Sequence, residues 1–437
     1  MSRDEPTYRA VGWGGRKSVL HRPRPLAEGA LEGLEAPALA VGLGRSYGDV
    51  GLVAGGVALQ SRARARFLNF DRESGVLAVE AGVTLGEIQR LAIPRGWALP
   101  VTPGTQQVTV AGAIANDVHG KNHARSGTFG AHVTRLRLAR SDGSISDLGP
   151  EDETGRFAAT IGGLGLTGAI LSAEIQLRPV AGPWLDTETV PFDGLDRFFE
   201  LFEESVEDWE YSVAWLDVTR KDRHRGLFLR ANHADERGPA LPARRQRRVP
   251  VTPPVSLIGP TSLRLFNALY YRRNAARAGR ARQNYQSYFY PLDALGAWNR
   301  IYGPRGFYQY QSVVPPEHAR EATAEMLAAI AEARQGSFLM VLKTFGARTS
   351  PGLLSFPREG TTLAMDFPDR GADTLRLFDR LDAILREAGG RIYPAKDARM
   401  SRAMFEFGYP GLAAFRAHRD PAMRSGFADR VMGGIDE

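Results

Sequence analysis

Cysteine is absent from the 437 residues of this chain. Its absence excludes disulfides, thiolate zinc sites, iron–sulfur clusters and cysteine nucleophiles. Redox chemistry therefore needs an organic cofactor or a metal held by other ligands. Long apolar runs are also missing, because no stretch approaches the roughly 20 apolar residues of a spanning helix, and the polar residues 1–8 lack the apolar core of a signal peptide. We expect a cytoplasmic protein without a signal peptide or transmembrane helix.

The net charge of +7 is distributed unevenly along the chain. Two arginine clusters flank the proline-rich residues 249–254: Arg244, Arg245, Arg247 and Arg248, then Arg272, Arg273, Arg277, Arg280 and Arg282. A solvated, mobile loop and a contact with an anionic membrane surface are the two interpretations. Because no helix-turn-helix or zinc-finger pattern surrounds these arginines, we expect no nucleic-acid partner.

Glycine and short β-branched runs dominate residues 38–180, which predicts strands and loops, with strands at 76–80, 135–139 and 170–177. One helix interrupts them. Thr84 and Glu87 form a capping box, and Leu85, Ile88 and Leu91 supply a buried face before Pro94.

Longer helical periods alternate with strands after residue 180. The pattern predicts helices over 192–209, 318–334 and 373–388, and strands over 211–219, 226–231, 337–343 and 361–367. The final residues are too few for a core of their own and must pack against an earlier part. The fold class is therefore α+β, with domains over 1–182 and 183–390 and a C-terminal segment over 391–437.

The sequence GLGLTG contains Gly163, Gly165 and Gly168 at the G-x-G-x-x-G spacing. A Rossmann motif must open a helix, whereas these glycines lead into the alternating residues 170–177. We therefore interpret the segment as a tight turn that packs against a ligand or another backbone.

Two other glycine-rich segments carry polar groups. Residues 42–49 place three glycines where backbone amides can converge on an anion, although a mere tight turn is the alternative. Residues 103–123 mix small residues with His119, Lys121 and His123. Together they suggest a dinucleotide held in an extended form. The H-x-x-x-H spacing of the two histidines could chelate a metal on a helix, but Gly120 and the missing glutamate argue against it, so no metal is expected.

Seven motifs in order, GRSYGD, GAIANDVHGKNH, GGLGLTG, YQYQ, VLKTFG, DFP and RIYPAKD, lie between residues 41 and 399. In this order and spacing they resemble the decaprenylphosphoryl-β-D-ribose 2'-oxidase family, within the vanillyl-alcohol oxidase and p-cresol methylhydroxylase (VAO/PCMH) superfamily. The resemblance implies a VAO/PCMH-type FAD-binding domain followed by an antiparallel-sheet substrate domain with helices, and a C-terminal segment that packs near the flavin.

The resemblance also implies the residues that hold FAD: Gly42, Gly44, Arg45, Ser46, Tyr47, Gly48, Asp49, Gly104, Thr109, Val110, Ala111, Gly112, Asn116, Asp117, Val118, His119, Ile170 and Tyr393. Sugar-lactone oxidases of the superfamily attach the flavin covalently through a histidine in the first loop. Arg45 stands at that position here, so we expect noncovalent FAD.

Oxidation of a sugar carbinol needs a hydride acceptor and a partner for the hydroxyl proton. The resemblance places His119 and Lys396 at the flavin as catalytic candidates, and a lysine there could also stabilise the reduced anionic flavin. It places Lys121, Gln309, Gln311, Lys343 and Thr362 at the substrate. Lys343 could instead snorkel from the end of its strand, and Gln309 and Gln311 could be an ordinary exposed pair on one strand face.

The chain departs from the family at Ala364, where mycobacterial members carry a cysteine that lines the substrate pocket. The flavin chemistry does not need that thiol. The departure therefore bears on the substrate.

The resemblance implies FAD-dependent oxidation of the 2'-hydroxyl of a polyprenyl-phosphoryl ribose to a keto sugar. A separate NAD(P)H-dependent reductase would complete the epimerisation to arabinose for a cell-wall arabinan or another glycolipid. The lipid-linked phosphorylated sugar would bring the protein to the membrane periphery, through the basic loop and apolar residues near 257–271. The alternatives are a sugar-lactone oxidase with a soluble substrate and a flavin-binding protein without turnover.

Overall fold

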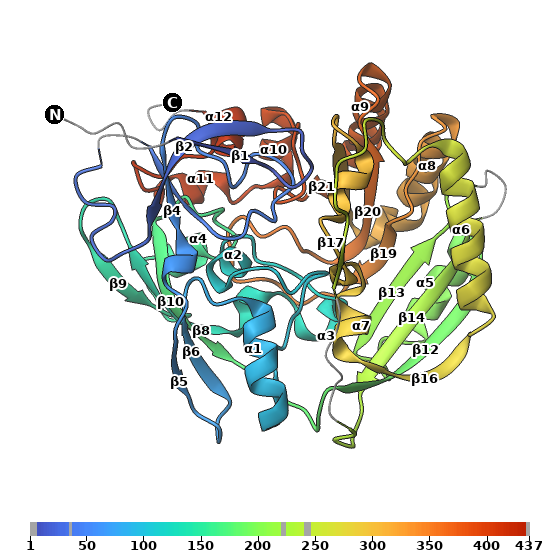
Figure 1. Cartoon of the computed structure of the whole chain (residues 1–437), viewed down its shortest axis with the longest axis horizontal. Coiled ribbons are helices and arrows are strands. Elements are labelled where there is room, and N and C mark those ends of the chain that lie inside the picture. The colour runs from blue at the N-terminus through green and yellow to red at the C-terminus, as the bar shows by residue number, and fades with distance from the viewer. Residues whose placement is uncertain (1–6, 35–36, 220–223, 240–245, 434–437) are drawn as a thin grey trace.

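Two groups of strands divide the chain near residue 180 (Figure 1). The computed structural model describes residues 7–34, 37–219, 224–239 and 246–433. Strands before residue 180 form two small sheets and a two-stranded ribbon, and those after it form one large antiparallel sheet and a second ribbon. The molecule is therefore α+β, as predicted.

The first group contains a four-stranded sheet of order β1-β2-β4-β3 and a five-stranded sheet of order β5-β6-β10-β8-β9. Its strands are β1 (Tyr8–Val11), β2 (Ser18–Pro25), β3 (Ala38–Val41), β4 (Val57–Gln60), β5 (Phe67–Phe70), β6 (Val76–Glu80), β8 (Val133–Ala139), β9 (Ile145–Leu148) and β10 (Ala169–Gln176), with β7 (Trp97–Ala98) and β11 (Arg178–Pro179) as the ribbon. The three strands predicted in this region are confirmed as β6, β8 and β10.

The first long helix, α1 (Leu85–Ala92), begins at the predicted capping box. The Glu87 amide donates to Thr84 Oγ1 at 3.2 Å, and the Thr84 amide donates to Glu87 Oε2 at 2.7 Å. Leu85 and Ile88 are fully buried. Shorter helical segments follow: η1 (Ser61–Ala63) precedes α1, and η2 (Ile93–Arg95), α2 (Val110–Ala115), α3 (His123–Ser126), η3 (Phe129–His132) and α4 (Arg156–Thr160) come after it.

The second group is dominated by an eight-stranded sheet of order β16-β12-β14-β13-β19-β20-β18-β21. Its strands are β12 (Trp184–Asp193), β13 (Tyr211–Leu216), β14 (Arg225–His233), β16 (Gly279–Asn284), β18 (Phe307–Val314), β19 (Met340–Phe345), β20 (Gly360–Pro368) and β21 (Arg391–Ile392), and the ribbon pairs β15 (Arg247–Arg248) with β17 (Leu295–Gly296). Arg247 and Arg248 therefore belong to a strand, whereas Arg244 and Arg245 lie outside the described residues.

Helices cover both faces of the large sheet. Three of them, α5 (Leu195–Glu203), α8 (Ala319–Glu332) and α9 (Ala372–Glu387), bury their apolar sides against one face in the largest core cluster. On the opposite face, Trp215 of β13 packs against Tyr270 of α6 (Pro260–Ala275), with ring centroids 4.8 Å apart. The remaining segments, α7 (Tyr285–Phe289), η4 (Pro291–Ala294), η5 (Trp298–Tyr302) and η6 (Pro316–His318), connect the strands.

One helix is shorter than its sequence pattern predicts. The expected helix over 192–209 exists only as α5, and Phe192 lies in β12, opposite Gly226. Gly194 adopts a left-handed backbone angle, φ +83°, between the strand and the helix. An apolar spacing of 3.6 residues cannot detect such a break, but the Asp193-Gly194 pair is a turn signal.

The C-terminal segment packs against both groups of strands. Its first residues form β21, which pairs with β18 of the large sheet. Farther on come α10 (Arg402–Gly408), α11 (Leu412–Arg416) and α12 (Gly426–Val431), and α10 packs against both β21 and α12 (Figure 1). The Ala38 amide donates to the carbonyl of Ala422 at 2.8 Å, which ties the segment to β3.

Candidate functional site

A cavity of about 410 Å³ is lined by residues of the small sheets, the large sheet and the C-terminal segment. All seven residues that were predicted to be catalytic or to bind substrate line it: His119, Lys121, Gln309, Gln311, Lys343, Thr362 and Lys396. Of the predicted cofactor residues, these line it as well: Gly42, Gly44, Arg45, Ser46, Tyr47, Gly48, Gly104, Thr109, Ala111, Gly112, Asn116, Val118, Ile170 and Tyr393. The fold thus gathers residues from positions 42 to 396 around one space.

Three predicted cofactor residues, Asp49, Val110 and Asp117, do not line the cavity. Val110 is completely buried in the apolar core. Asp117, at φ +38°, turns away from the cavity and accepts hydrogen bonds from Ser350, Ser355 and the Gly130 amide. Asp49 pairs with Arg430 instead, at 2.7 Å. These three side chains point away from the cavity and hold the loops through contacts with the rest of the protein. Neighbouring residues of a loop cannot all face the same space.

Glycines give the cavity its room along the first two loops. A Cβ atom on Gly44 or Gly104 would meet no protein atom within 4 Å, so a side chain there would project into open space. Gly48 is different, since a Cβ atom there would lie 2.0 Å from the carbonyl oxygen of Asp397. Gly44 and Gly104 leave a cradle for a ligand, and Gly48 lets the C-terminal segment approach.

The segment around α2 presents polar backbone to the cavity. Thr109 caps the helix by accepting a hydrogen bond from the Gly112 amide at 3.2 Å. The Tyr393 hydroxyl donates to the carbonyl of Asn116 at 3.0 Å. The buried Asn116 Oδ1 has no hydrogen-bond partner among the residues that the structure describes. An unpaired buried acceptor in a cavity wall is expected where a ligand supplies the missing donor.

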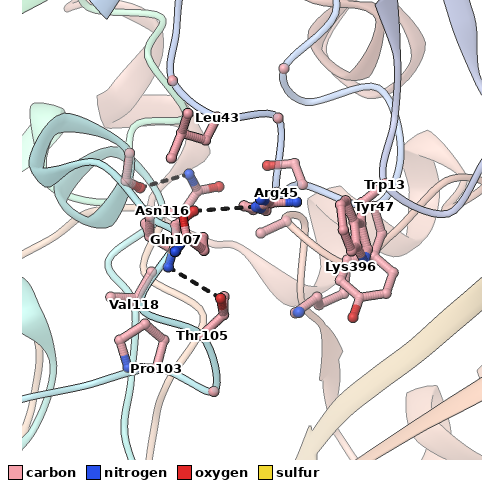
Figure 2. A pocket seen from close by; sticks show the side chains of 18 of the residues that line it. Trp13, Leu43, Arg45, Tyr47, Pro103, Thr105, Gln107, Asn116, Val118 and Lys396 are labelled. Carbon is pink, nitrogen blue, oxygen red and sulfur yellow. Dashed lines mark hydrogen bonds between the residues drawn. The ribbon is translucent and has the colours of Figure 1, made fainter. Parts of the chain in front are cut away.

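Arg45 crosses the cavity from the first loop. Figure 2 shows it between Gln107 and the ring of Trp13, with Tyr47 and Lys396 close by. Its Nε donates to the carbonyl of Gln107 at 3.4 Å, and its guanidinium lies 4.3 Å from the centroid of the Trp13 ring. Burial lowers the pKa of Arg45, while Asp293 and Tyr47 oppose the shift. The guanidinium stays charged, and it can bind an anion.

The large sheet forms the floor of the cavity. In antiparallel strands, directly paired residues point to the same face. Gln311 pairs with Ala364, which pairs with Val341, and Lys343 pairs with Thr362. All five line the cavity, whereas the intervening Tyr310 and Leu342 join the core beneath the opposite helices. The two glutamines are therefore part of the site and not an exposed pair.

His119 lies at the junction of the α2 segment and this floor. Its Nδ1 is 3.2 Å from Lys343 Nζ, and its Nε2 is 3.0 Å from the side-chain amide of Gln311. The rings of Phe345 and Tyr393 pack against it at 4.8 and 5.6 Å. Burial, with the nearby charges of Lys343, His123 and Lys396, holds the pKa of His119 well below its usual value. The imidazole is therefore neutral at neutral pH.

Lys121 and Lys343 bring two ammonium groups to the same end of the cavity. Lys121 Nζ donates to the carbonyl of Tyr288 and lies 4.3 Å from the centroid of that ring. Lys343 Nζ donates to the carbonyl of Gly120 at 3.2 Å, so it is held within the site. Burial lowers the pKa of each lysine to about 7, and for Lys343 the charges of Lys121 and Lys396 contribute. An anion placed here would be stabilised by both.

Lys396 reaches the cavity from the C-terminal segment, with Nζ 4.0 Å from the centroid of the Tyr47 ring. Burial lowers its pKa, and the buried Asp366 opposes that shift. Burial raises the pKa of Asp366, which accepts a hydrogen bond from Gln309 Nε2. That same amide lies 3.5 Å from the Tyr47 hydroxyl. Gln309 therefore links the carboxylate to the ring on which Lys396 rests.

Further residues line the cavity that the sequence did not single out. Gly165 of the tight glycine turn contacts it, which confirms that this turn packs against a ligand space and leads into a strand. Leu339, Val341, Trp298 and Asp293 contribute the wall on the large-sheet side. The period-two alternation of residues 337–343 predicts one side of a strand, but it cannot tell which side faces the cavity.

The sequence of this chain is similar to those of several known proteins. Residues 32–149 match the family model of the FAD binding domain. Decaprenylphosphoryl-beta-D-ribose oxidase of Mycolicibacterium smegmatis is 34% identical over 92% of each chain. An uncharacterized protein in the mprA 5'region of Streptomyces coelicolor is 32% identical over 77% of this chain and 95% of its own. A putative D-arabinono-1,4-lactone oxidase of Neurospora crassa is 27% identical over only 36% of this chain and 28% of its own.

Proposed function

The chain belongs to the decaprenylphosphoryl-β-D-ribose oxidase family of FAD-dependent oxidoreductases, and from this premise we propose that it oxidises the 2'-hydroxyl of a polyprenyl-phosphoryl ribose. The product would be a keto sugar, and the oxidation would be the first half of an epimerisation to arabinose. The observation that carries the proposal is the cluster of His119, Lys121, Lys343 and Lys396 in the one cavity that also contains the glycine cradle.

The cradle fits FAD. Gly44 and Gly104 leave open space at the cavity wall, and Arg45 provides a cation. Asn116 Oδ1 can accept a hydrogen bond from the ligand, because it has no partner among the described residues. When it is bound, FAD supplies the acceptor for the hydride from the sugar carbon. Arg45 stands where sugar-lactone oxidases of the superfamily carry the histidine that attaches the flavin. An arginine does not form that bond, so the proposal is for noncovalent FAD.

Lys396 is the proposed proton acceptor for the sugar hydroxyl. Burial lowers its pKa, which increases the fraction of neutral amine near neutral pH. His119 is less available, since both of its nitrogens have neighbours. Lys343 Nζ lies at Nδ1, and the Gln311 side-chain nitrogen, a donor, lies at Nε2. His119 is therefore proposed to position Lys343 and Gln311 beside the sugar and not to accept the hydroxyl proton.

The substrate phosphate is proposed to bind at Lys121 and Lys343. The two ammonium groups occupy the end of the cavity next to His119, and their low pKa values reflect removal from water without a countercharge. A phosphate would supply that countercharge. Gln309, Gln311 and Thr362 add polar groups on the floor that can bind the ribose hydroxyls.

Two partners complete the proposal. The keto sugar needs a separate NAD(P)H-dependent reductase, because its reduction uses a nicotinamide cofactor, whereas the glycine cradle of the described residues is proposed to hold FAD. The lipid-linked substrate needs contact with a membrane periphery. None of the helices in the described parts of the chain is long and apolar enough to cross a bilayer. Contact would therefore occur through the surface, at the basic loop and near residues 257–271.

Anaerobic mixing with polyprenyl-phosphoryl ribose, and separately with free aldonolactones, tests the proposal against its two rivals. We expect loss of the visible flavin absorbance only with the phosphoryl ribose. Loss only with lactones would identify a sugar-lactone oxidase. No change with any sugar would favour a flavin-binding protein without turnover. The match to the lactone oxidase covers only 36% of this chain and 28% of that protein, so it gives the rival less support than the family match gives the proposal.

A further inference from the structure

One stretch of the chain carries more positive charge than the chain has in net. Residues 237–292 contain eleven arginines and no lysine, aspartate or glutamate, whereas the whole chain has a net charge of +7. The rest of the chain is therefore net negative. Such a separation of charge along one surface segment indicates an anionic partner.

The same stretch exposes apolar side chains on α6. Leu265 and Leu269, one turn apart, are 62% and 57% exposed, and Phe266 beside them is 45% exposed. The opposite side of the helix is anchored by the buried Asn267, whose side-chain amide donates to Asp217 at 3.1 Å. The helix is thus fixed to the sheet with its apolar residues outward. Leu257, just before the helix, is 56% exposed as well.

Arginines surround these apolar residues. Arg264 lies within the same helix face, and Arg272 and Arg273 occupy its last turns, all three exposed. Long arginine side chains beside exposed leucines are the composition of a helix that lies in a lipid interface, with its apolar side in the acyl region and its cations among the headgroups.

The apolar surface continues to the cavity. Phe266 contacts Phe338 with ring centroids 5.5 Å apart, and the next residue, Leu339, lines the cavity. Trp298 of η5 also lines the cavity, and it belongs to an apolar cluster against which Ile258, Phe338 and Leu339 pack. Apolar side chains therefore connect the cavity wall to α6 and its preceding segment. Figure 1 shows α6 over the large sheet, on the side of the molecule away from the glycine-rich half.

We propose that α6 and residues 251–257 dock on an anionic lipid bilayer, and that the polyprenyl chain of the substrate leaves the cavity past Leu339 and Trp298 into that bilayer. The inference rests on the proposed function for the identity of the chain that leaves, whereas the docking surface stands on the charge and exposure of α6. A bilayer fits better than a protein partner, because exposed arginines and exposed apolar residues alternate along one outward face of α6.

Vesicle cosedimentation of the FAD-loaded protein tests the docking. With vesicles of phosphatidylcholine and phosphatidylglycerol, we expect binding at least about tenfold tighter than with phosphatidylcholine alone. The double variant Leu265→Ser/Leu269→Ser should bind the anionic vesicles at least about tenfold more weakly. The double variant Arg272→Glu/Arg273→Glu should bind the anionic vesicles about tenfold more weakly, and its affinity should depend less on salt concentration.

Matched controls lie on the other half of the molecule. Leu68→Ser removes a leucine that is 51% exposed on β5, and Arg72→Glu/Arg135→Glu reverses the charge at two exposed positions. Both should bind vesicles like the unchanged protein. Equal losses in controls and α6 variants would overturn the docking surface, as would vesicle binding unaffected by any variant. Concentration-dependent dimerisation that the α6 variants abolish would assign the surface to a second copy and overturn the proposal too.

Flavin reduction separates this inference from the function on which it rests. With a short-chain phosphoryl ribose in detergent, Leu265→Ser/Leu269→Ser should reduce the flavin at the unchanged rate. With a long-chain substrate embedded in vesicles, the same variant should be at least about tenfold slower. If the unchanged protein binds vesicles through α6 but no phosphoryl ribose bleaches the flavin, the function fails and the lipid exit fails with it. If bleaching occurs while the variant is unimpaired on vesicles, only the present inference is refuted.

Discussion

Arg430 and Asp49, 381 positions apart, form a two-pronged ion pair with distances of 2.7 and 3.1 Å. The same guanidinium also contacts Asp397 at 2.9 Å, directly after the cavity lysine Lys396. One arginine of α12 therefore fastens the first glycine-rich loop to the segment that carries Lys396. Both carboxylates are nearly buried, with 8% and 5% of their side chains exposed, so they depend on this cation.

Replacing Arg430 by alanine should lower both stability and FAD affinity. Removing Arg430 leaves Asp397 without this cation and leaves Asp49 with only the more distant Lys17 at 3.8 Å, and we expect a loss of about 3 kcal/mol in the free energy of unfolding. Urea unfolding of the apoprotein measures the first effect and flavin fluorescence titration the second. Arg424→Ala removes the exposed pair with Asp429 near the same helix and should change either quantity little. Equal effects of the two substitutions would contradict the fastening role.

Gly104→Val tests the glycine cradle. No protein atom lies within 4 Å of a Cβ atom there, so the apoprotein should unfold at an unchanged urea concentration. The valine would occupy space that FAD needs, and we expect the dissociation constant for FAD to rise at least about tenfold. Gly336→Ala adds a methyl group in ordinary contact with Val218, outside the cavity, and should leave FAD binding unchanged. Undiminished FAD binding by Gly104→Val would place the cofactor elsewhere.

Substrate binding should take up protons above neutral pH. Lys121 and Lys343 have pKa values of about 7, so at pH 8 they are mostly neutral, and an arriving phosphodiester, which does not itself titrate in this range, raises both values. Calorimetry in two buffers of different ionisation enthalpy should detect about one proton per lysine at pH 8 and much less at pH 6. Affinity should therefore fall as the pH rises through 7.

Lys343→Met should remove about half of that proton uptake, while Lys17→Met, outside the cavity, should not alter it. Proton release, or uptake that is equal at pH 6 and pH 8, would show that the phosphate does not meet these lysines.

Asp366→Asn should shift the pH dependence of flavin reduction. A neutral Lys396 is required to accept the proton, so the rate rises with pH through the pKa of Lys396. The negative charge of Asp366 raises that pKa, and its removal should move the rising limb to lower pH by about one unit. Asp369→Asn alters a carboxylate that pairs with Arg16 instead and should not move the limb. A shift to higher pH would exclude Lys396 as the base.

Ala364→Cys should create a reactive thiol where the family's mycobacterial members have one. The unchanged chain has no cysteine and therefore no thiol, so inhibitors that depend on a pocket thiol should fail to label it. Intact-mass analysis with iodoacetamide should show one adduct on Ala364→Cys, because that position lines the cavity. Leu363→Cys, one residue away on the buried opposite face, should react only after unfolding. A stable covalent adduct with the unchanged chain would refute the expectation.

Local signals in the sequence predicted most of the elements. The capping box of Thr84 and Glu87 and the alternation after Gly168 depend on neighbouring residues alone, and both are confirmed. The helix expected from Phe192 to Trp209 was too long, because a single glycine turn divides a strand from a helix without disturbing the apolar spacing. Boundaries set by one backbone angle are invisible to periodicity.

The family resemblance carried by the ordered motifs predicted FAD as the cofactor, and all but three of the site residues that it implied line the cavity. Which way each side chain points was decided by the tertiary structure. Asp49 and Asp117 belong to the loops that line the cavity, but their side chains point away from it. Asp49 pairs with Arg430, and Asp117 accepts hydrogen bonds from Ser350 and Ser355. Direction depends on partners hundreds of residues away, and the burial that shifts the pKa values of Lys121, Lys343 and Lys396 exists only once the sheets, loops and C-terminal segment have closed around them.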